Sequence, residues 1–307
     1  MNFQQLRIFR EAVRRDFNLT EVAEALFTSQ SGVSKHMKDL EAELGVELFV
    51  RRGKRLLGLT GPGEEMVAIV DRMLRDAKTL RSIADEFGNR DEGSLTVATT
   101  HTQARYALPR VVADFRRLYP KVHLSIYEAA PEQIPELLRE GRADIGIATE
   151  GLGDVDALAA FPFYEWHHAV IAPAGHPLEA ARPLDLAALA AYPIVTYREG
   201  FTGRQRIDRA FAQAGLTPDF VLSAMDADVI KTYVELGLGV GIVASVAVGN
   251  TSGTGLRVLP SGDLFGRNTT LIAVCRDHYL RGFAYRFIEL CDPRLSEAVI
   301  RAGAAGE

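Results

Sequence analysis

Three stretches of helical hydrophobic period open the chain. Apolar residues recur at helical spacing over residues 3–13, 22–26 and 33–44, and Thr20 is positioned to cap the second helix. A short polar break separates the second stretch from the third, and Gly45 follows the third. Two short helices joined by a tight turn are expected here, which predicts a helix-turn-helix.

The outward side of the third stretch is rich in hydroxyl, amide and ammonium groups. Such groups suit base edges and phosphates in a major groove, although a solvated polar helix face has the same composition. A basic run without acids follows between Val50 and Gly58, and Gly53 predicts a hairpin turn within it. A basic hairpin in this place is typical of a wing that contacts phosphates, with a solvated charge run as the alternative. The candidate DNA-binding residues are Thr28, Ser29, Gln30, Ser31, Ser34, Lys35, Lys38, Arg51, Arg52, Lys54 and Arg55.

A narrow apolar seam runs along residues 62–88. Pro62 suits the first turn of a helix, and apolar residues from Met66 to Phe87 alternate spacings of four and three, as in a heptad repeat. A stripe this narrow fits a partner helix, so we expect a dimer-forming linker helix; packing within the same chain is the alternative. The polar, glycine-flanked residues 88–93 predict a hinge.

Short apolar runs alternate with helical segments beyond residue 93. This alternation predicts an α/β architecture with mostly parallel sheets, and its length favours two lobes. Strands are expected at 95–98, 122–127, 145–148, 169–171, 194–196, 220–222, 241–243 and 271–274, and helices at 104–118 and 133–140.

Composition excludes several classes of protein. The formal net charge is -5, so DNA contact depends on a local basic patch and not on the overall charge. The two cysteines, Cys275 and Cys291, are too few for a disulfide framework or a zinc cluster, and we expect neither a metal site nor a cofactor. The N-terminus lacks an apolar signal core and no membrane-length apolar run follows, so a cytoplasmic protein without membrane contact is expected.

Several strings in the chain are too long and specific to arise by chance. One comprises Leu19, Thr20, Ala23, Leu26, residues 28–31, Ser34, Leu40, Glu41, Leu44, Gly45, Leu48 and Phe49, extended by Arg51, Arg52 and residues 60–63. It resembles the signature of LysR-type transcriptional regulators. Residues 99–109, 200–204 and 226–234 resemble the CysB-like branch of that family.

This resemblance implies an N-terminal winged helix-turn-helix, a long linker helix and a two-lobed effector domain like a periplasmic binding protein. It implies homodimers or homotetramers that bind double-stranded promoter DNA and work with RNA polymerase. The controlled genes would serve sulfur assimilation and cysteine biosynthesis, and the effector would be acetylserine, sulfate or a related sulfur anion. A LysR-type regulator of another pathway, such as alkanesulfonate use, with a different anionic effector is the alternative. The expected domains are 1–60 (DNA binding), 61–92 (linker and hinge) and 93–307 (effector binding), with lobe I at about 93–164 and 268–295 and lobe II at about 165–267.

The effector is expected between the lobes, at the carboxyl ends of parallel strands. Residues 99–103 and Thr149 follow predicted strands, while Thr202 and Gly203 precede a predicted helix. Hydroxyls and free N–H groups at helix N-termini bind anions without Lys or Arg, although threonines there can be simple caps. Trp166 falls near the lobe crossover and could wall the cleft. By resemblance the effector-contacting residues are Thr100, Thr102, Gln103, Thr149 and Thr202.

One position departs from the branch, and two other classes of protein fit the sequence less well. Ala130 stands where branch members carry serine, and the chain ends at Glu307, earlier than theirs, so effector identity is open. The glycine run 237–241 follows a helix and precedes a strand, which is the reverse of the order that pyrophosphate binding requires. We therefore expect that the protein is not an enzyme. A solute-binding protein would share the two lobes but would have no use for residues 2–58.

Overall fold

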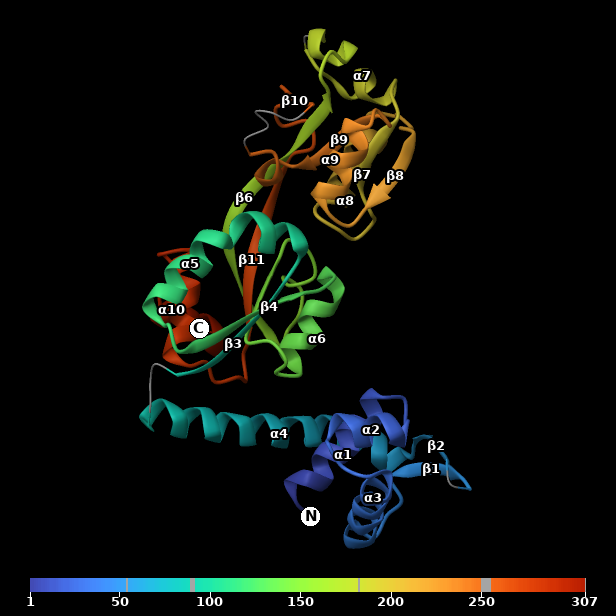
Figure 1. The fold of residues 1–307 in the computed structure, drawn as a ribbon, viewed down its shortest axis with the longest axis vertical. Coiled ribbons are helices and arrows are strands. Elements are labelled where there is room, and N and C mark those ends of the chain that lie inside the picture. The colour runs from blue at the N-terminus through green and yellow to red at the C-terminus, as the bar shows by residue number, and fades with distance from the viewer. Residues whose placement is uncertain (54, 89–91, 182, 250–254, 307) are drawn as a thin grey trace. The chain divides into compact units, whose positions relative to one another are not determined.

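The chain forms two compact units, described here from a computed structural model (Figure 1). They comprise Met1–Ala84 and Asp85–Glu307. Lys54 of the expected wing and residues 89–91 of the expected hinge lie outside the described part of the chain. The described residues are 1–53, 55–88, 92–181, 183–249 and 255–306.

Helices and one hairpin build the N-terminal unit, as the hydrophobic periods predict. The predicted Thr20 cap is wrong, because Asn18 is the capping residue and its side chain accepts a hydrogen bond from the Thr20 backbone N at 3.2 Å. Gly45 adopts the left-handed conformation with φ 71° and ends the third helix, as predicted. The elements are α1 (Phe3–Arg14), α2 (Leu19–Ala25), α3 (Gln30–Leu44), β1 (Phe49–Arg52), β2 (Arg55–Leu59) and α4 (Gly61–Gly88).

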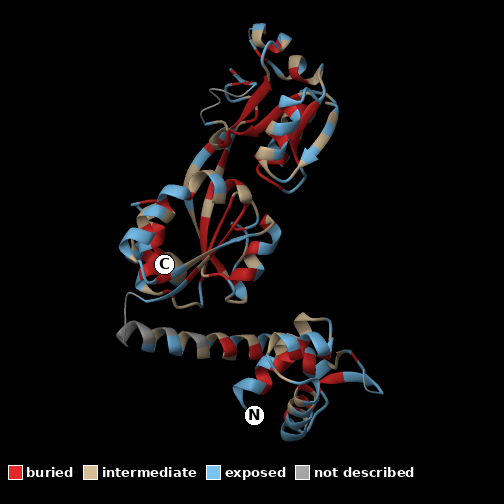
Figure 2. Ribbon diagram, in the orientation of Figure 1, coloured by how far each residue is buried: buried red, intermediate tan, exposed pale blue. Residues whose placement is uncertain are grey.

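The long helix α4 uses the first part of its apolar seam inside its own unit. Val70 is buried in one core cluster with Phe9 and Phe49, and Met66 and Met73 pack against that cluster. Figure 2 shows buried segments in α4. The alternative of packing within the chain is therefore right for this part of the helix. Farther along, Leu80 is 69% exposed, so the seam continues without cover from its own unit.

A nine-stranded mixed sheet organises the C-terminal unit. Its order is β4-β3-β5-β11-β6-β9-β7-β8, and β10 pairs with β6. Among the described residues four strand pairs of this sheet are parallel and four are antiparallel. The expectation of a mostly parallel sheet is therefore wrong, because half of the pairs are antiparallel. The strands are β3 (Gly93–Thr99), β4 (Val122–Glu128), β5 (Ile145–Ala148), β6 (Leu158–Pro173), β7 (Ile194–Tyr197), β8 (Phe220–Ala224), β9 (Val240–Ala244), β10 (Leu256–Leu259) and β11 (Arg267–Cys275).

The long strands β6 and β11 account for the antiparallel pairs, because they carry the chain between two halves of the sheet (Figure 1). The first part of β6 pairs with β11, whereas its last part pairs with β9 and β10. We call β3–β5 with the adjoining parts of β6 and β11 the first lobe, and β7–β10 with the end of β6 the second lobe. Trp166 pairs with Asn268 at the junction.

The helices of this unit begin and end close to their expected positions, with one correction. The helix expected over 104–118 is divided, because Pro109 lacks an N–H and starts a new helix after a π-helical turn at Gln103–Ala107. Short 3-10 turns occupy Pro131–Gln133, Pro177–Ala180 and Ser245–Ala247. The α-helices are α5 (Pro109–Leu118), α6 (Ile134–Arg139), α7 (Leu186–Ala190), α8 (Arg204–Gln213), α9 (Ala227–Glu235), α10 (Gly282–Cys291) and α11 (Glu297–Ala305).

Each lobe has a hydrophobic core of its own. Leu95, Phe115 and Phe287 lie in a core cluster of the first lobe, and Ile194 and Phe211 in one of the second. No helix of the described residues is long and apolar enough to cross a membrane.

Candidate DNA interface and effector site

The N-terminal end of α3 presents polar side chains to solvent. Ser29 caps the helix, and its Oγ accepts a hydrogen bond from the Gly32 backbone N at 3.1 Å. The hydroxyl is therefore partly committed to the helix end. Of the other candidates on this segment, Thr28 and Ser34 are half-buried, and the exposed ones are Gln30, Ser31, Lys35 and Lys38.

An exposed aromatic residue in the turn before α3 was missed by sequence reasoning. Phe27 is 98% exposed and has φ 50°, a conformation that non-glycine residues adopt rarely. A large apolar side chain without cover on this side of the unit enlarges the surface available to a partner. The only signal in the sequence is an aromatic residue beside the polar break.

The hairpin β1–β2 carries the expected basic residues, and Glu41 ties it to α3. Gly53 has φ 66° at the turn, as the hairpin requires. The Arg51 guanidinium lies 2.6 Å from Glu41 Oε2, while Oε1 of the same carboxylate accepts hydrogen bonds from the backbone of β1 and the residue before it. Arg51 thus has a structural role besides any contact with DNA.

Arg52 and Arg55 face each other across the hairpin. They are register partners in adjacent strands, and both are exposed. Like charges placed directly opposite one another destabilise a hairpin, so this pair favours a polyanionic partner.

The first segment of the candidate effector site follows β3. Thr99, Thr100, Thr102 and Gln103 are all at least 93% buried, and Thr99 donates its hydroxyl to the Ile147 carbonyl at 2.8 Å. Thr99 therefore links neighbouring strands. The Thr102 hydroxyl is buried and lies beside the Tyr197 hydroxyl.

Three predicted residues converge on Thr270, a residue in the middle of β11. The Gln103 amide lies 3.3 Å from the Thr270 hydroxyl, the Thr149 hydroxyl 3.3 Å, and the Trp166 indole N–H donates to it at 3.1 Å. Tyr164 donates its hydroxyl to the Gln103 side-chain oxygen at 2.6 Å. Residues as far apart in sequence as Gln103 and Thr270 thus form one hydrogen-bonded group.

The second lobe contributes the turn before α8, which has an unusual backbone. Thr202 has φ 45° and Gly203 has φ 71°. The Thr202 carbonyl accepts a hydrogen bond from Nε2 of His168 at 3.0 Å, while Asn268 lies 3.5 Å from the other ring nitrogen. Burial lowers the pKa of His168 to about 4, so this ring is neutral at physiological pH.

Glu150 connects this turn to the first lobe. It follows Thr149 in sequence, and its Oε1 accepts a hydrogen bond from the backbone N–H of Gly203. Burial raises the pKa of Glu150 to about 7, although the backbone N–H groups of Gly203 and Thr202 partly offset this effect. The other carboxylate oxygen is buried without a hydrogen-bond partner.

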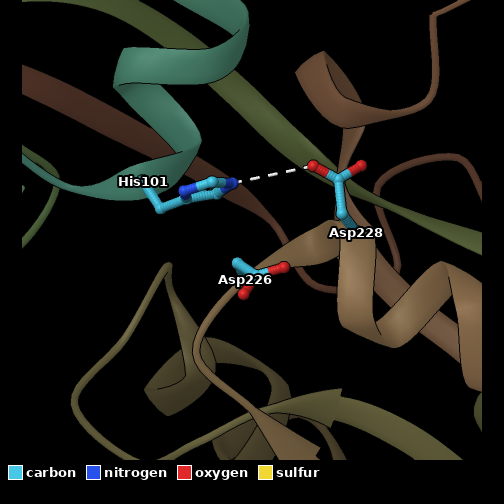
Figure 3. A group of neighbouring side chains, drawn as sticks. All are labelled: His101, Asp226 and Asp228. Atoms are coloured by element: carbon cyan, nitrogen blue, oxygen red, sulfur yellow. Dashed lines mark ion pairs between the residues drawn. The ribbon is translucent and has the colours of Figure 1, made fainter.

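A charged cluster also joins the lobes. The Asp228 carboxylate receives the Tyr106 hydroxyl at 2.7 Å and lies 2.9 Å from the Lys231 ammonium. These contacts hold the pKa of Asp228 down at about 2 despite the opposing effect of burial. His101 lies 3.6 Å from Asp228 and close to Asp226, with the ring facing both carboxylates (Figure 3).

This cluster has the residue types of a metal site, but its groups already have partners. The ligand atoms of His101, Asp226 and Asp228 lie within 4.8 Å of one another. Asp226 caps α9 by accepting the Val229 backbone N–H at 2.9 Å, and Lys231 already neutralises Asp228. The arrangement therefore favours an ion-pair network between the lobes over a cation site.

Comparisons with known proteins agree with this two-part organisation. Residues 3–64 match the family model of the bacterial regulatory helix-turn-helix proteins of the lysR family, and residues 88–296 match the LysR substrate binding domain. The chain is 54% identical over 300 residues to the HTH-type transcriptional regulator SsuR of Burkholderia cenocepacia, which covers 98% of this chain and 97% of that protein.

Two further relatives are similar over nearly their whole length. The regulator Cbl of Escherichia coli is 53% identical over 296 residues, covering 96% of this chain and 94% of that one. The regulator CysB of Burkholderia cenocepacia is 50% identical over 307 residues, covering 100% and 98%.

Solved structures show the same architecture. The crystal structure of the cofactor-binding domain of the Cbl regulator matches with a TM-score of 0.68 at 47% identity, over 70% of this chain and 95% of that one. A full-length OxyR variant from Pseudomonas aeruginosa matches with a TM-score of 0.71 at 26% identity, over 96% and 94%.

Proposed function

Because this chain belongs to the LysR family of transcriptional regulators, we propose that it controls genes of sulfur assimilation and cysteine biosynthesis in response to acetylserine or a sulfur anion. Its relatives are transcriptional regulators, not enzymes, and regulators of this family bind promoter DNA and small effectors as oligomers. The names CysB, Cbl and SsuR among these relatives support the choice of pathway.

DNA recognition is assigned to α3 and the hairpin. Gln30, Lys35 and Lys38 would read or approach the major groove, and Arg52 and Arg55 would hold the phosphate backbone. Their exposure supports this assignment. The remaining candidates of this surface are Thr28, Ser29, Ser31, Ser34, Arg51 and Lys54, of which Lys54 lies outside the described residues.

The convergence of separate segments on Thr270 carries the effector assignment. Gln103, Thr149 and Trp166 are brought together there, and Thr202 is linked through its neighbour Gly203 to Glu150, the residue after Thr149. Hydroxyl and amide groups beside helix N-termini suit a small anionic or zwitterionic ligand. Thr100 and Thr102 complete the proposed set.

Effector binding would act by changing the relation of the lobes. A ligand that contacts both lobes stabilises one arrangement over another by its differential affinity. In a homodimer or homotetramer that change would alter how the DNA-binding units meet the promoter and how RNA polymerase is recruited.

A regulator of another sulfur pathway, such as alkanesulfonate use, is the second candidate, and Ala130 favours it. Its methyl packs against a core cluster of the second lobe, and its backbone N–H donates to Gln133 at 3.2 Å. A serine there would add a hydroxyl, so the ligand of this chain would lack that contact.

Two substitutions test whether the two sites are separable. Gln30→Ala should weaken promoter binding about tenfold or more while effector binding stays unchanged, because a bidentate base contact discriminates by about 1–3 kcal/mol. Thr202→Ala should weaken effector binding and leave promoter binding intact. Gel retardation and calorimetry with O-acetylserine, N-acetylserine, sulfate, thiosulfate and adenosine phosphosulfate measure both. Loss of DNA binding in both folded variants would contradict the proposal.

A further inference from the structure

The carboxylate of Glu150 occupies the position where a helix N-terminus would otherwise receive an anion. It extends from the end of β5 in the first lobe to the backbone N–H of Gly203, directly before α8 in the second lobe. Thr202 and Gly203 both have left-handed φ values, which turns consecutive N–H groups toward one acceptor. The chain thus supplies its own carboxylate to this turn.

Only one oxygen of that carboxylate is satisfied. Oε1 accepts the Gly203 N–H, while Oε2 is buried without a partner. A buried acceptor left unpaired carries an energetic penalty that a ligand can remove by donating a hydrogen bond.

We propose that Glu150 sets the chemical class of the effector, by accepting a hydrogen bond from an N–H or O–H group of the ligand and by disfavouring anions that carry no such donor. This inference rests on the effector site proposed above and adds a requirement to it. An ionised carboxylate repels an anion that has no hydrogen-bond donor, and Oε2 of Glu150 then stays unpaired. An ammonium or amide group of the ligand would instead donate a hydrogen bond to that oxygen.

Replacing Glu150 by glutamine should change the group that the site requires of its ligand from a hydrogen-bond donor to an acceptor. The side chain keeps its size, and the Gly203 N–H fixes the glutamine oxygen in the place of Oε1. The amide NH₂ then stands where Oε2 stood, so that a donor replaces an acceptor at the unpaired position. E150Q should therefore favour those ligands that the wild-type protein disfavours.

Calorimetry at pH 8 with two pairs of ligands tests this exchange. O-acetylserine and N-acetylserine carry N–H donors, whereas sulfate and thiosulfate carry no proton. E150Q in the full chain should bind the first pair about tenfold more weakly than wild type and the second pair about tenfold more tightly, the size expected for one hydrogen bond to a charged group. Glu165→Gln, which removes an exposed carboxylate paired with Arg267, is the matched control and should change neither.

The outcomes separate this inference from the function on which it rests. If wild type binds acetylserines or sulfur anions but E150Q shifts all four affinities in one direction, or by less than twofold, Glu150 is a structural link and the inference is wrong while the effector site stands. If wild type binds none of the four, the sulfur effector fails and the inference fails with it. Thermal melting of E150Q verifies that the variant is folded.

Discussion

The proposed DNA-binding surface and the proposed effector site differ in how they would recognise their ligands. On α3 and the hairpin the candidate residues are close in sequence and mostly exposed, and many are cationic, as with Lys35 and Arg52. At the effector site the candidate residues are uncharged and mostly buried, and the hydrogen bond between Gln103 and Thr270 joins positions 167 residues apart. A change at the first site should mainly alter binding, whereas a change at the second should alter binding and stability together.

A glycine in each region gives the largest expected contrast. Gly203→Ala would place its Cβ 2.6 Å from the Asn268 oxygen and 2.8 Å from the His168 ring, at φ 71°. We expect a loss of unfolding free energy of about 3 kcal/mol or more, because steric overlap adds to backbone strain.

Gly53→Ala is the matched variant in the hairpin. Its φ is 66°, but nothing lies within 4 Å of the added Cβ, so the loss should be only about 1 kcal/mol. Denaturant unfolding of both variants measures the difference. Equal losses would break the contrast between the open and the packed region.

The pH dependence of stability should reveal the buried carboxylate of Glu150. Its pKa in the folded protein is about 7, above its ordinary value of 4.5, so the folded state holds the proton more tightly than the unfolded one. The corresponding stability is present below about pH 4.5 and is lost as the pH rises through 7, by about 3 kcal/mol. Glu150→Gln has no such titration.

Urea titrations at several pH values compare the two proteins. Their stability difference should shift in favour of the variant as the pH rises from 5 to 9. A constant difference over that range would mean that Glu150 is not buried in the folded protein.

A lysine on α3 should have a smaller effect, confined to DNA binding. Lys35→Ala removes one exposed cation, so affinity for a duplex should fall and the slope of log affinity against log salt should decrease by about one. Lys121→Ala, the same change at an exposed residue of the other unit, should leave the slope unchanged. Fluorescence anisotropy over a salt series measures both, and equal slopes for the two variants would remove Lys35 from the interface.

The smallest effect is expected in the cluster that joins the lobes, because this cluster is charged but only partly buried. Tyr106→Phe deletes the hydroxyl that donates to Asp228 and accepts from Lys231 at 2.7 Å. Because these groups are only partly buried, we expect a loss of about 0.5–1.5 kcal/mol, visible as a small decrease in melting temperature. No change in either stability or effector affinity would show that the cluster does not hold the lobes together.

The contrast between these two regions also explains which features could be predicted from the sequence. Hydrophobic period and turn residues predicted α3, the hairpin and most strands, because these depend on neighbours along the chain. They could not predict Thr270, Glu150 or Tyr164, since each is an ordinary residue of a strand or loop until the sheet brings it to a partner. The threonines at the effector site were named through family resemblance, and their convergence required the fold.

The balance of parallel and antiparallel pairs was also beyond local patterns. The predicted strand at 169–171 is the end of the 16-residue strand β6, and its first part pairs with β11 in the other lobe. The segment between them contains Pro162, Glu165 and His167, so the residues before the predicted strand do not read as one continuous strand.

The salt dependence of the two binding equilibria tests the central claim most directly. DNA affinity and effector affinity of the full chain would be measured between about 50 and about 200 mM KCl, by anisotropy and calorimetry. The account predicts that affinity for the duplex falls at least about a hundredfold, because released counterions drive that binding, while effector affinity changes less than about threefold. Duplex binding that is insensitive to salt, or effector binding that declines in parallel with it, would contradict a molecule that holds DNA by exposed charge and its effector in a buried site.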